Sequence, residues 1–229
     1  NQVQHYYSRG AEKVTVIYNG VDLKRFRPMT QKDRVLAKKT MGISDDATVF
    51  VFAGSDLRRK GLSQLLSAFA QFREQPFILL VAGSMGNRDL KKRIEGMGLG
   101  QNVKWLGYVK DMERVYALAD LFVLPTHYDP FANTTLEAMA CGTPALTTRQ
   151  NGAEEVVGIV APWLVIERPE AEAIGSTIEA FTALSTEERR LLSEKARRIA
   201  QKFTWQRHIE DLITILVQHS NPIKTVIKA

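Results

Sequence analysis

The sequence predicts an α/β fold built on a doubly wound, Rossmann-like parallel sheet that is followed by C-terminal helices. Short runs of β-branched, aromatic and aliphatic residues alternate with segments whose apolar residues recur at helical spacing. The strand-like runs are almost continuously apolar, which is typical of parallel strands covered by helices on both faces. A chain of 229 residues, 45% of them hydrophobic, is long enough for one such domain or two smaller ones.

Five strands are expected before the C-terminal helices. They cover residues 47–54, 77–83, 103–107, 121–125 and 144–148. Right-handed crossovers between such strands produce a doubly wound sheet, whose ligands bind at the carboxyl ends of the strands.

Helices are expected between these strands and after the last one. They cover approximately residues 61–74, 88–97, 111–118, 134–141, 187–200 and 205–217. Gly98 and Gly100 suit the end of the second of these helices. Trp205 opens the last helical pattern and is expected to anchor it, whereas residues 149–168 show no clear periodicity.

The composition excludes several classes of protein. The single cysteine, Cys141, can form neither an internal disulfide nor a zinc site by itself, so a buried apolar role is expected for it. No apolar run approaches the roughly 20 residues of a membrane-spanning helix, and no signal peptide opens the chain. We therefore expect a soluble, cytoplasmic protein.

The net charge of +6 is unevenly distributed. Residues 1–40 contain nine basic and three acidic groups, whereas the remainder of the chain has equal numbers of the two. Such a local excess indicates a solvated surface, with contact to a polyanion or a membrane surface as the alternative. Few aromatic residues interleave it, and we expect no nucleic-acid partner.

The first strand-end loop, residues 54–61, is typical of an anion site. It reads Gly-Ser-Asp-Leu-Arg-Arg-Lys-Gly and precedes a helix, whose N-terminal N–H groups would add to the positive charge. A simple polar turn is the alternative. The chain contains neither the GxGxxG fingerprint nor a GxxxxGK[ST] loop, so a dinucleotide site and a P-loop are both unsupported.

The loop after the fourth strand contains two carboxylates at informative positions. Asp129 lies at the strand end, where it can accept hydrogen bonds from ligand hydroxyls, and Glu137 lies about one turn into the next helix, where it could accept from a ribose. Asn133 or Thr134 is expected to cap this helix and leave N–H groups free for a phosphate. Alternatively, Asp129 is a turn residue and Glu137 a helix-dipole partner.

Together these motifs resemble the GT-B fold glycosyltransferases of family 4, known as glycosyl transferases group 1. The resembling segments are Tyr18–Asp22, Phe26–Pro28, Arg59–Gly61, Val103–Val109, Asp129–Pro144 and Gly152–Val156, in the family's order along the chain. The resemblance implies a retaining transfer of a hexosyl group from a nucleoside-diphosphate sugar to a glycan or lipid-linked acceptor. It implies no cofactor and no metal.

The resemblance also implies roles for individual residues. Lys60, Arg59 and Asp129 are expected to be catalytic, the two cations on the diphosphate and the carboxylate on the transferred sugar. Glu137 is expected to hold the ribose and Val109 the base. The other expected donor-binding residues are Gly54, Ser55, Arg58, Phe131, Ala132, Asn133, Thr134 and Thr135.

Two positions depart from the family's pattern. Ser55 stands where members usually have an arginine, and Arg58 or Arg59 is expected to supply that charge. Asp129 stands where members usually have a glutamate. The Ser-Asp-x-x-Arg-Lys-Gly turn is similar to that of the lipopolysaccharide-core glucosyltransferase branch, which makes a UDP-sugar the expected donor.

The resemblance covers only about half of a GT-B enzyme. It assigns residues 1–28 to the end of an N-terminal domain and the interdomain linker, 29–203 to the donor-binding domain, and 204–229 to a C-terminal helix and tail. The missing N-terminal domain is therefore an expected partner, and contact with the inner face of a membrane is possible. A non-catalytic sugar-nucleotide binding module and a nucleotide-sugar epimerase remain the alternatives.

Overall fold

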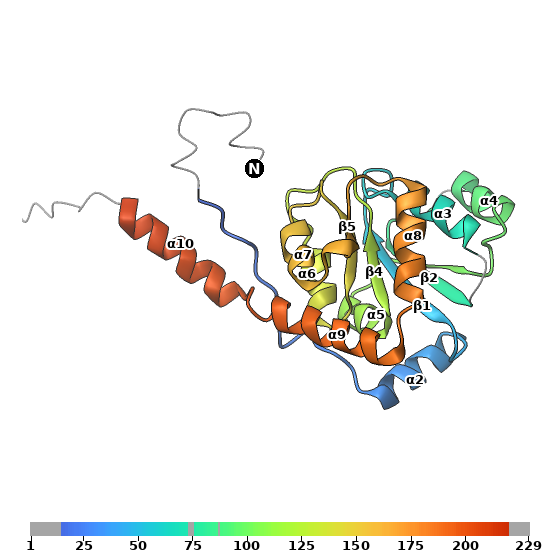
Figure 1. Cartoon of the computed structure of the whole chain (residues 1–229), viewed down its shortest axis with the longest axis horizontal. Coiled ribbons are helices and arrows are strands. Elements are labelled where there is room, and N and C mark those ends of the chain that lie inside the picture. Colours follow the sequence, from blue (N-terminus) through green and yellow to red (C-terminus); the bar gives the residue numbers. More distant parts are fainter. Residues whose placement is uncertain (1–14, 73–75, 87, 220–229) are drawn as a thin grey trace, which may run out of the picture.

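The computed structural model describes residues 15–72, 76–86 and 88–219 and contains the expected doubly wound sheet (Figure 1). Six parallel strands lie in the order β3-β2-β1-β4-β5-β6. They are β1 (Thr48–Gly54), β2 (Phe77–Gly83), β3 (Val103–Gly107), β4 (Leu121–Leu124), β5 (Ala145–Thr148) and β6 (Val165–Ile166). The strand order reverses between β1 and β4, and this reversal creates the crevice where such sheets bind ligands.

Burial on both faces explains the continuous apolar runs of the central strands. β1 pairs with β2 along its whole length, from Thr48 opposite Phe77 to Gly54 opposite Gly83. Every residue of β4 is buried, and so is every residue of β1 except the terminal Gly54. β6 was not expected from the sequence, because two residues are too few to show a hydrophobic period.

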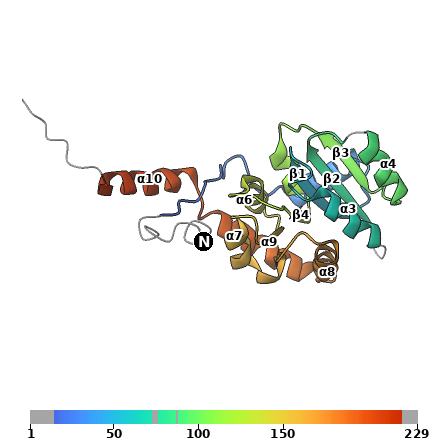
Figure 2. The same ribbon diagram turned by 90° about the horizontal axis from the view of Figure 1, so that it is seen from above.

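Helices cover both faces of the sheet (Figures 1 and 2). They are α2 (Gln31–Thr40), α3 (Leu62–Gln71), α4 (Arg88–Gly96), α5 (Met112–Leu118), α6 (Asn133–Ala140), α7 (Glu154–Val160), α8 (Ala171–Thr182), α9 (Thr186–Ala200) and α10 (Trp205–His219). Right-handed crossovers put α3 and α4 on one face and α5, α6 and α7 on the other. α8 packs against α3, and α9 packs against α6 and α7.

Helix boundaries differ slightly from the sequence expectation. α3 ends at Gln71 because Phe72 has an extended backbone and turns its ring into a cluster with Phe69 and Phe77. The expected end of this helix at residues 73–74 lies outside the described residues. Gly98 has a φ of +74°, which agrees with its expected place just beyond α4.

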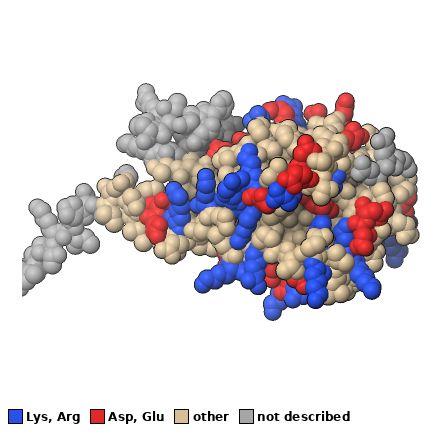
Figure 3. Space-filling model, turned by 60° about the horizontal axis from the view of Figure 1, so that its bottom comes forward, with Lys and Arg blue, Asp and Glu red and all other residues tan. Residues whose placement is uncertain are grey.

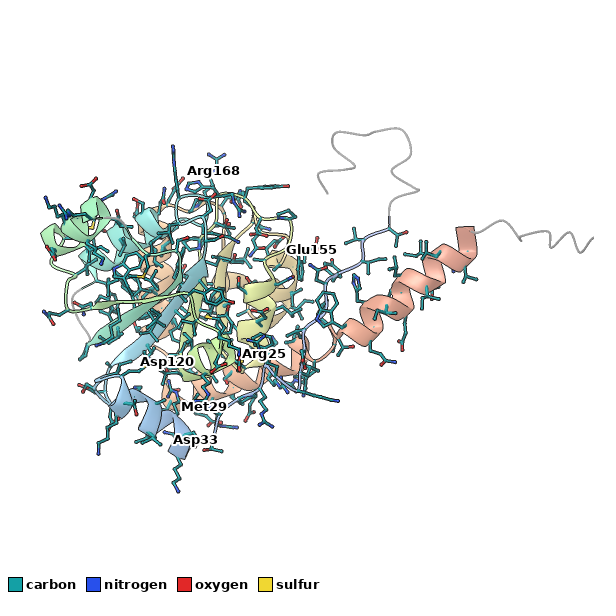
Figure 4. The ribbon with its side chains drawn as sticks, turned by 180° about the vertical axis from the view of Figure 1, so that it is seen from behind. Arg25, Met29, Asp33, Asp120, Glu155 and Arg168 are labelled. Atoms are coloured by element: carbon teal, nitrogen blue, oxygen red, sulfur yellow. The ribbon has the colours of Figure 1, made fainter. Side chains whose placement is uncertain are left out.

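Residues 15–21 and α10 extend from the rest of the structure side by side (Figures 1 and 2), and a ring nitrogen of His208 lies 2.8 Å from the carbonyl of Tyr18. The N–H of Val21 donates to the carbonyl of Phe203 at 2.9 Å, and Tyr18 donates to the Glu155 carboxylate, labelled in Figure 4. α10 projects from the domain with its apolar side chains exposed. Trp205 is 45% exposed and touches His208 edge-on, so the expectation that Trp205 anchors the helix is wrong.

Part of the N-terminal positive charge makes structural contacts. Arg34 pairs with Asp120 at 2.6 Å, and Arg25 pairs with Glu113 at 2.9 Å; Asp120 and Arg25 are labelled in Figure 4. Lys38 is buried and donates to the carbonyls of Asp45 and Ala47. Figure 3 shows basic and acidic side chains interspersed over the face that includes α2 and α9. Two arginines of the basic segment are thus paired with carboxylates of the same chain.

Replacing Gly61 with alanine is expected to destabilise the fold by about 3 kcal/mol. Gly61 has a φ of +80°, and a Cβ there would lie 1.9 Å from the carbonyl oxygen of Pro125. Gly42→Ala is the matched control, because Gly42 has a φ of +60° with nothing within 4 Å, and it should lose only about 1 kcal/mol. Urea denaturation measures both. Equal losses would show that the contact with Pro125 is unimportant.

Candidate functional site

A buried ion pair joins the loops after β1 and β4. The Lys60 ammonium donates to Oδ2 of Asp129, and the two residues are 9% and 8% exposed. Nη1 of Arg59 lies 3.5 Å from the same oxygen and donates to the carbonyl of Tyr128 at 2.7 Å. Gly54 permits this arrangement because the stem of Lys60 crosses directly over it. The structure thus brings together the three residues that the resemblance assigns to catalysis.

The backbone around Asp129 is fixed by the loop after β5. The N–H of Asp129 donates to the carbonyl of Gln150 at 2.9 Å, and the N–H of Gly152 donates to the carbonyl of Asp129 at 2.9 Å. Oδ1 of Asp129 accepts from the N–H of Phe131 at 3.2 Å. Because both carboxylate oxygens have partners, the side chain is held toward Lys60.

Asn151 holds the turn that precedes α6 and was missed by the sequence analysis. This fully buried side chain accepts from the N–H groups of Ala132 and Ala153, each at 3.1 Å. It donates to the hydroxyls of Thr147 at 2.9 Å and Thr135 at 3.3 Å. Asn151 directly precedes the Gly152–Val156 segment, and an asparagine in a turn beside a glycine was the available signal.

The start of α6 offers N–H groups to an anion, but its cap differs from the expectation. Ala132 occupies the N-cap position, so neither Asn133 nor Thr134 caps the helix. The Asn133 side chain instead accepts from Asn19 at 2.9 Å, because the linker passes alongside. The Thr134 hydroxyl is buried without a hydrogen-bond partner among the described residues. An incoming anion would meet the N–H groups of Asn133 and Thr134, whereas the N–H of Thr135 already donates to the carbonyl of Ala132 at 2.9 Å.

Glu137 lies one turn into α6 and is only partly exposed. Burial raises the pKa of its carboxyl group, while the Tyr116 hydroxyl and the Arg25 guanidinium oppose that shift. Tyr116 is completely buried beside this carboxyl group, and burial followed by the nearby Glu137 charge raises the pKa of its hydroxyl. The surroundings of Glu137 therefore disfavour its charged form. Hydrogen bonds from ligand hydroxyls would stabilise that charged form.

The remaining expected residues lie at the same edge of the sheet. Ser55 follows β1, and its carbonyl accepts from the Ser84 hydroxyl at 2.5 Å. Val109 follows β3 and packs partly buried against the core. Arg58 is exposed and has no ion-pair partner in the described part of the chain, unlike Arg59, which turns toward Asp129. Of the two arginines expected to supply the charge missing at Ser55, only Arg59 therefore lies against the carboxylate of Asp129.

A cavity of about 900 Å³ adjoins this edge on the side of α3 and α4. It is lined by Asp56, Leu57, Arg58, Arg59, Leu62, Ser63, Gln64, Met85, Leu90, Arg93 and His127. Arg59 belongs both to this lining and to the cluster around Asp129. The α6 residues are absent from the lining, so the cavity is a neighbour of the anion-binding turn rather than its interior.

Within residues 15–72, 76–86 and 88–219, no three His, Cys, Asp or Glu side chains gather as a group that could bind a metal ion. None of the helices there has the length and apolar character that crossing a membrane requires.

Known proteins are similar to this chain over most of its length. Residues 33–199 match the family model described as "Glycosyl transferases group 1". The chain is 31% identical over 229 aligned residues to the D-inositol 3-phosphate glycosyltransferase of Saccharomonospora viridis. This alignment covers 94% of the chain and 52% of that protein. The chain spans about half the length of the curated relatives it matches.

Two solved structures share the fold closely. Anabaena Alr3699/HepE in complex with UDP-glucose has a TM-score of 0.77 and 26% identity, over 89% of this chain and 58% of that chain. The sucrose-phosphate synthase of Thermosynechococcus elongatus has a TM-score of 0.80 and 25% identity, over 95% of this chain and 55% of that chain. Both solved structures thus share the doubly wound architecture of this chain.

Asn151→Ala should reduce the free energy of unfolding by about 2–4 kcal/mol, because four buried hydrogen-bonding groups lose their partner. Asn133→Ala serves as the control and should lose less than about 0.5 kcal/mol, since its bond to Asn19 is exposed. Urea denaturation monitored by circular dichroism measures both. A cost for Asn151→Ala no larger than that of the control would contradict the structural role of Asn151.

Glu137→Gln should stabilise the domain at pH 7. Burial raises the pKa of Glu137 in the folded state, so the folded protein binds this proton more tightly than the unfolded chain does. The parent therefore gains stability as the pH falls through that raised pKa, and the advantage of the variant should disappear below the unfolded value of about 4.3.

Melting temperatures measured between pH 4 and pH 8 test this expectation. Glu187→Gln is the control of opposite sign, because the hydrogen bond from Arg190 lowers the pKa of Glu187 and the charged form is the favoured one. A Glu137→Gln effect that stays constant across this pH range would rule out titration of Glu137 as its origin.

Proposed function

This chain belongs to the glycosyl transferases group 1 family, and we propose that it is the donor-binding part of a retaining hexosyltransferase. The donor is a nucleoside-diphosphate sugar, and the acceptor is a glycan or a lipid-linked molecule. The observation that supports this most directly is the buried Lys60–Asp129 pair beside Arg59 and the open start of α6. Such an arrangement of pre-placed cations and N–H groups suits a diphosphate.

In the free protein, the Lys60 ammonium binds the Asp129 carboxylate, which therefore lies where a ligand anion would bind Lys60. A donor diphosphate would offer Lys60 more negative charge and would draw it away from Asp129. The freed carboxylate then contacts the hydroxyls of the transferred sugar, which is the role that the family resemblance gives to this position.

Leaving-group stabilisation is the main catalytic contribution of this domain. The bond between the anomeric carbon and the β-phosphate oxygen breaks, and the anomeric carbon bonds to the acceptor hydroxyl oxygen on the same face. The nucleoside diphosphate takes the electron pair, and the hydroxyl proton passes to its phosphate. Lys60, Arg59 and the α6 backbone at residues 133–135 stabilise the charge that develops there.

The nucleoside half of the donor lies toward α6 and the loop after β3. Glu137 accepts hydrogen bonds from the ribose hydroxyls, and Val109 with its neighbours holds the base. The similar Anabaena protein is in complex with UDP-glucose, which favours a UDP-sugar as the donor here. No metal ion is needed in this proposal, because the cations are supplied by side chains.

The rest of the reaction depends on a second domain. The proposed division is 1–28 for the linker, 29–203 for the donor-binding domain and 204–229 for the C-terminal helix and tail, of which residues 1–14 and 220–229 lie outside the described part. The exposed apolar face of α10 and the double length of the relatives support an N-terminal partner domain. The Ser-Asp-x-x-Arg-Lys-Gly turn favours an acceptor of the lipopolysaccharide-core type, reached from the cytoplasm at the inner face of the membrane.

Lys60→Met is expected to weaken UDP binding at least about tenfold, because a charge-assisted contact to the diphosphate is lost. It should also destabilise the fold by about 3 kcal/mol, because Asp129 stays buried without its partner. Calorimetry measures the first effect and urea denaturation the second. Normal UDP affinity in a folded Lys60→Met variant would refute the proposed diphosphate site.

The double variant Lys60→Met/Asp129→Asn separates these two effects. It should recover most of the lost stability without recovering UDP affinity. Asp129→Asn alone should bind UDP more tightly than the parent, because nothing then competes for Lys60, yet the full-length enzyme with this change should transfer sugar more slowly. Product analysis of that enzyme also separates transfer from epimerisation and from binding alone.

A further inference from the structure

Arg25, in the segment that leads into the domain, binds two neighbouring parts of the structure at once (labelled in Figure 4). Its Nη2 atom donates to the carbonyl of Lys110 at 2.6 Å, and its Nε atom donates to the Glu113 carboxylate at 2.9 Å. Lys110 directly follows Val109, and Glu113 lies in the first turn of α5. One guanidinium group thus connects the loop after β3 to the start of α5.

The turn that contains Arg25 is itself well ordered by short contacts. Oδ1 of Asp22 accepts from the N–H groups of Lys24 at 2.9 Å and Arg25 at 3.2 Å, and the N–H of Phe26 donates to the carbonyl of Asp22 at 2.8 Å. The Arg25 guanidinium lies 5.0 Å from the centre of the Phe26 ring, which is buried 6.2 Å from the ring of Tyr116. The core therefore fixes the position from which Arg25 reaches the loop.

These contacts of Arg25 contribute little to the stability of the fold. The side chains of Arg25 and Glu113 are 47% and 24% exposed, and ion pairs with such exposure add little to the free energy of unfolding. A planar guanidinium that binds a carbonyl and a carboxylate together nevertheless fixes their relative position. The arrangement thus suits the orientation of a loop better than the stabilisation of a domain.

Arg25 also influences Glu137 through its charge. Burial raises the pKa of the Glu137 carboxyl, the Tyr116 hydroxyl and Arg25 lower it, and Glu113 raises it again. Arg25 and Glu113 are partners in one ion pair, yet they act on Glu137 in opposite directions. A cation beside Glu137 favours the charged carboxylate, which accepts hydrogen bonds more strongly than the neutral acid does.

Two other titratable groups lie near the C-terminal end of α6, and neither changes its charge between pH 5 and pH 8. Burial raises the pKa of the Cys141 thiol to about 12. Arg197, on α9, donates to the carbonyls of Phe26 and Ala140 and keeps its charge, as arginines in proteins do. A pH dependence that responds to Arg25 over this range is therefore not due to these two groups.

We propose that Arg25 is a positioning residue for the nucleoside half of the donor, and that it acts through the loop after β3 and through Glu137 without touching the donor. The proposal rests on the proposed transferase function, because that function assigns the base to Val109 and the ribose to Glu137. Arg25 holds the loop on which the base lies, and it keeps the carboxylate that binds the ribose in its charged form.

UDP and inorganic pyrophosphate are the two probes of this proposal, and calorimetry on the 229-residue chain measures both. Arg25→Gln should weaken UDP binding about fivefold at pH 7, because the loop loses the hydrogen bond that orients it. Pyrophosphate lacks the ribose and the base, so its affinity should not change. Lys24→Gln is the matched control: it removes a charge from the neighbouring exposed position and should alter neither affinity.

Arg25→Gln and Glu113→Gln break the same ion pair but should shift the titration of Glu137 in opposite directions. Loss of Arg25 raises the pKa of Glu137 further, so UDP affinity should fall at a higher pH than in the parent as the pH is lowered from 8 to 5. Loss of the Glu113 charge lowers that pKa, so UDP affinity should persist to a lower pH. The titration of UDP itself is common to all variants and cancels from this comparison.

The carboxyl carbon signal of Glu137 in NMR spectra measures the same two shifts directly, without a ligand. Shifts of the same sign in Arg25→Gln and Glu113→Gln would overturn the proposal, because only the broken ion pair would then matter. Equal effects of Arg25→Gln and Lys24→Gln would also overturn it, as would equal losses of UDP and pyrophosphate affinity. If the parent binds neither ligand, the proposed function fails, whereas the NMR titration still decides whether Arg25 acts on Glu137.

Discussion

The buried ion pair between Lys60 and Asp129 is the interaction on which the rest of the site depends. It connects the loops after β1 and β4, the two neighbouring strands at which the strand order reverses. Two buried charges are tolerated only because each neutralises the other. The pair therefore fixes both loops, and the hydrogen bond from His127 to the carbonyl of Arg59, at 2.8 Å, reinforces the same junction.

The surrounding structure keeps this junction open to an anion. Asn151 accepts a hydrogen bond from the N–H of Ala132, in the turn before α6. No side chain caps the first turn of α6 itself. Glu137 lies one turn further along α6, where burial raises the pKa of its carboxyl group. The groups proposed to bind the phosphates and the ribose thus lie along one short helix.

Arg58 and Arg59 are adjacent in sequence but serve different sides of the sheet edge. Arg59 turns inward to Tyr128 and Asp129, whereas Arg58 faces the cavity that it shares with Arg93. Arg59 therefore borders both the cavity and the cluster around Asp129.

The sequence by itself determined the order of strands and helices and the edge of the sheet where the site lies, because apolar periodicity and glycine placement act over a few residues. Its motifs also predicted Lys60, Asp129 and Glu137 as site residues. Only the tertiary structure decided that Lys60 pairs with Asp129, 69 residues away, that Asn151 supports α6, and that Trp205 is exposed. Contacts between distant segments depend on how the whole chain packs, and no local pattern records which buried polar groups will meet.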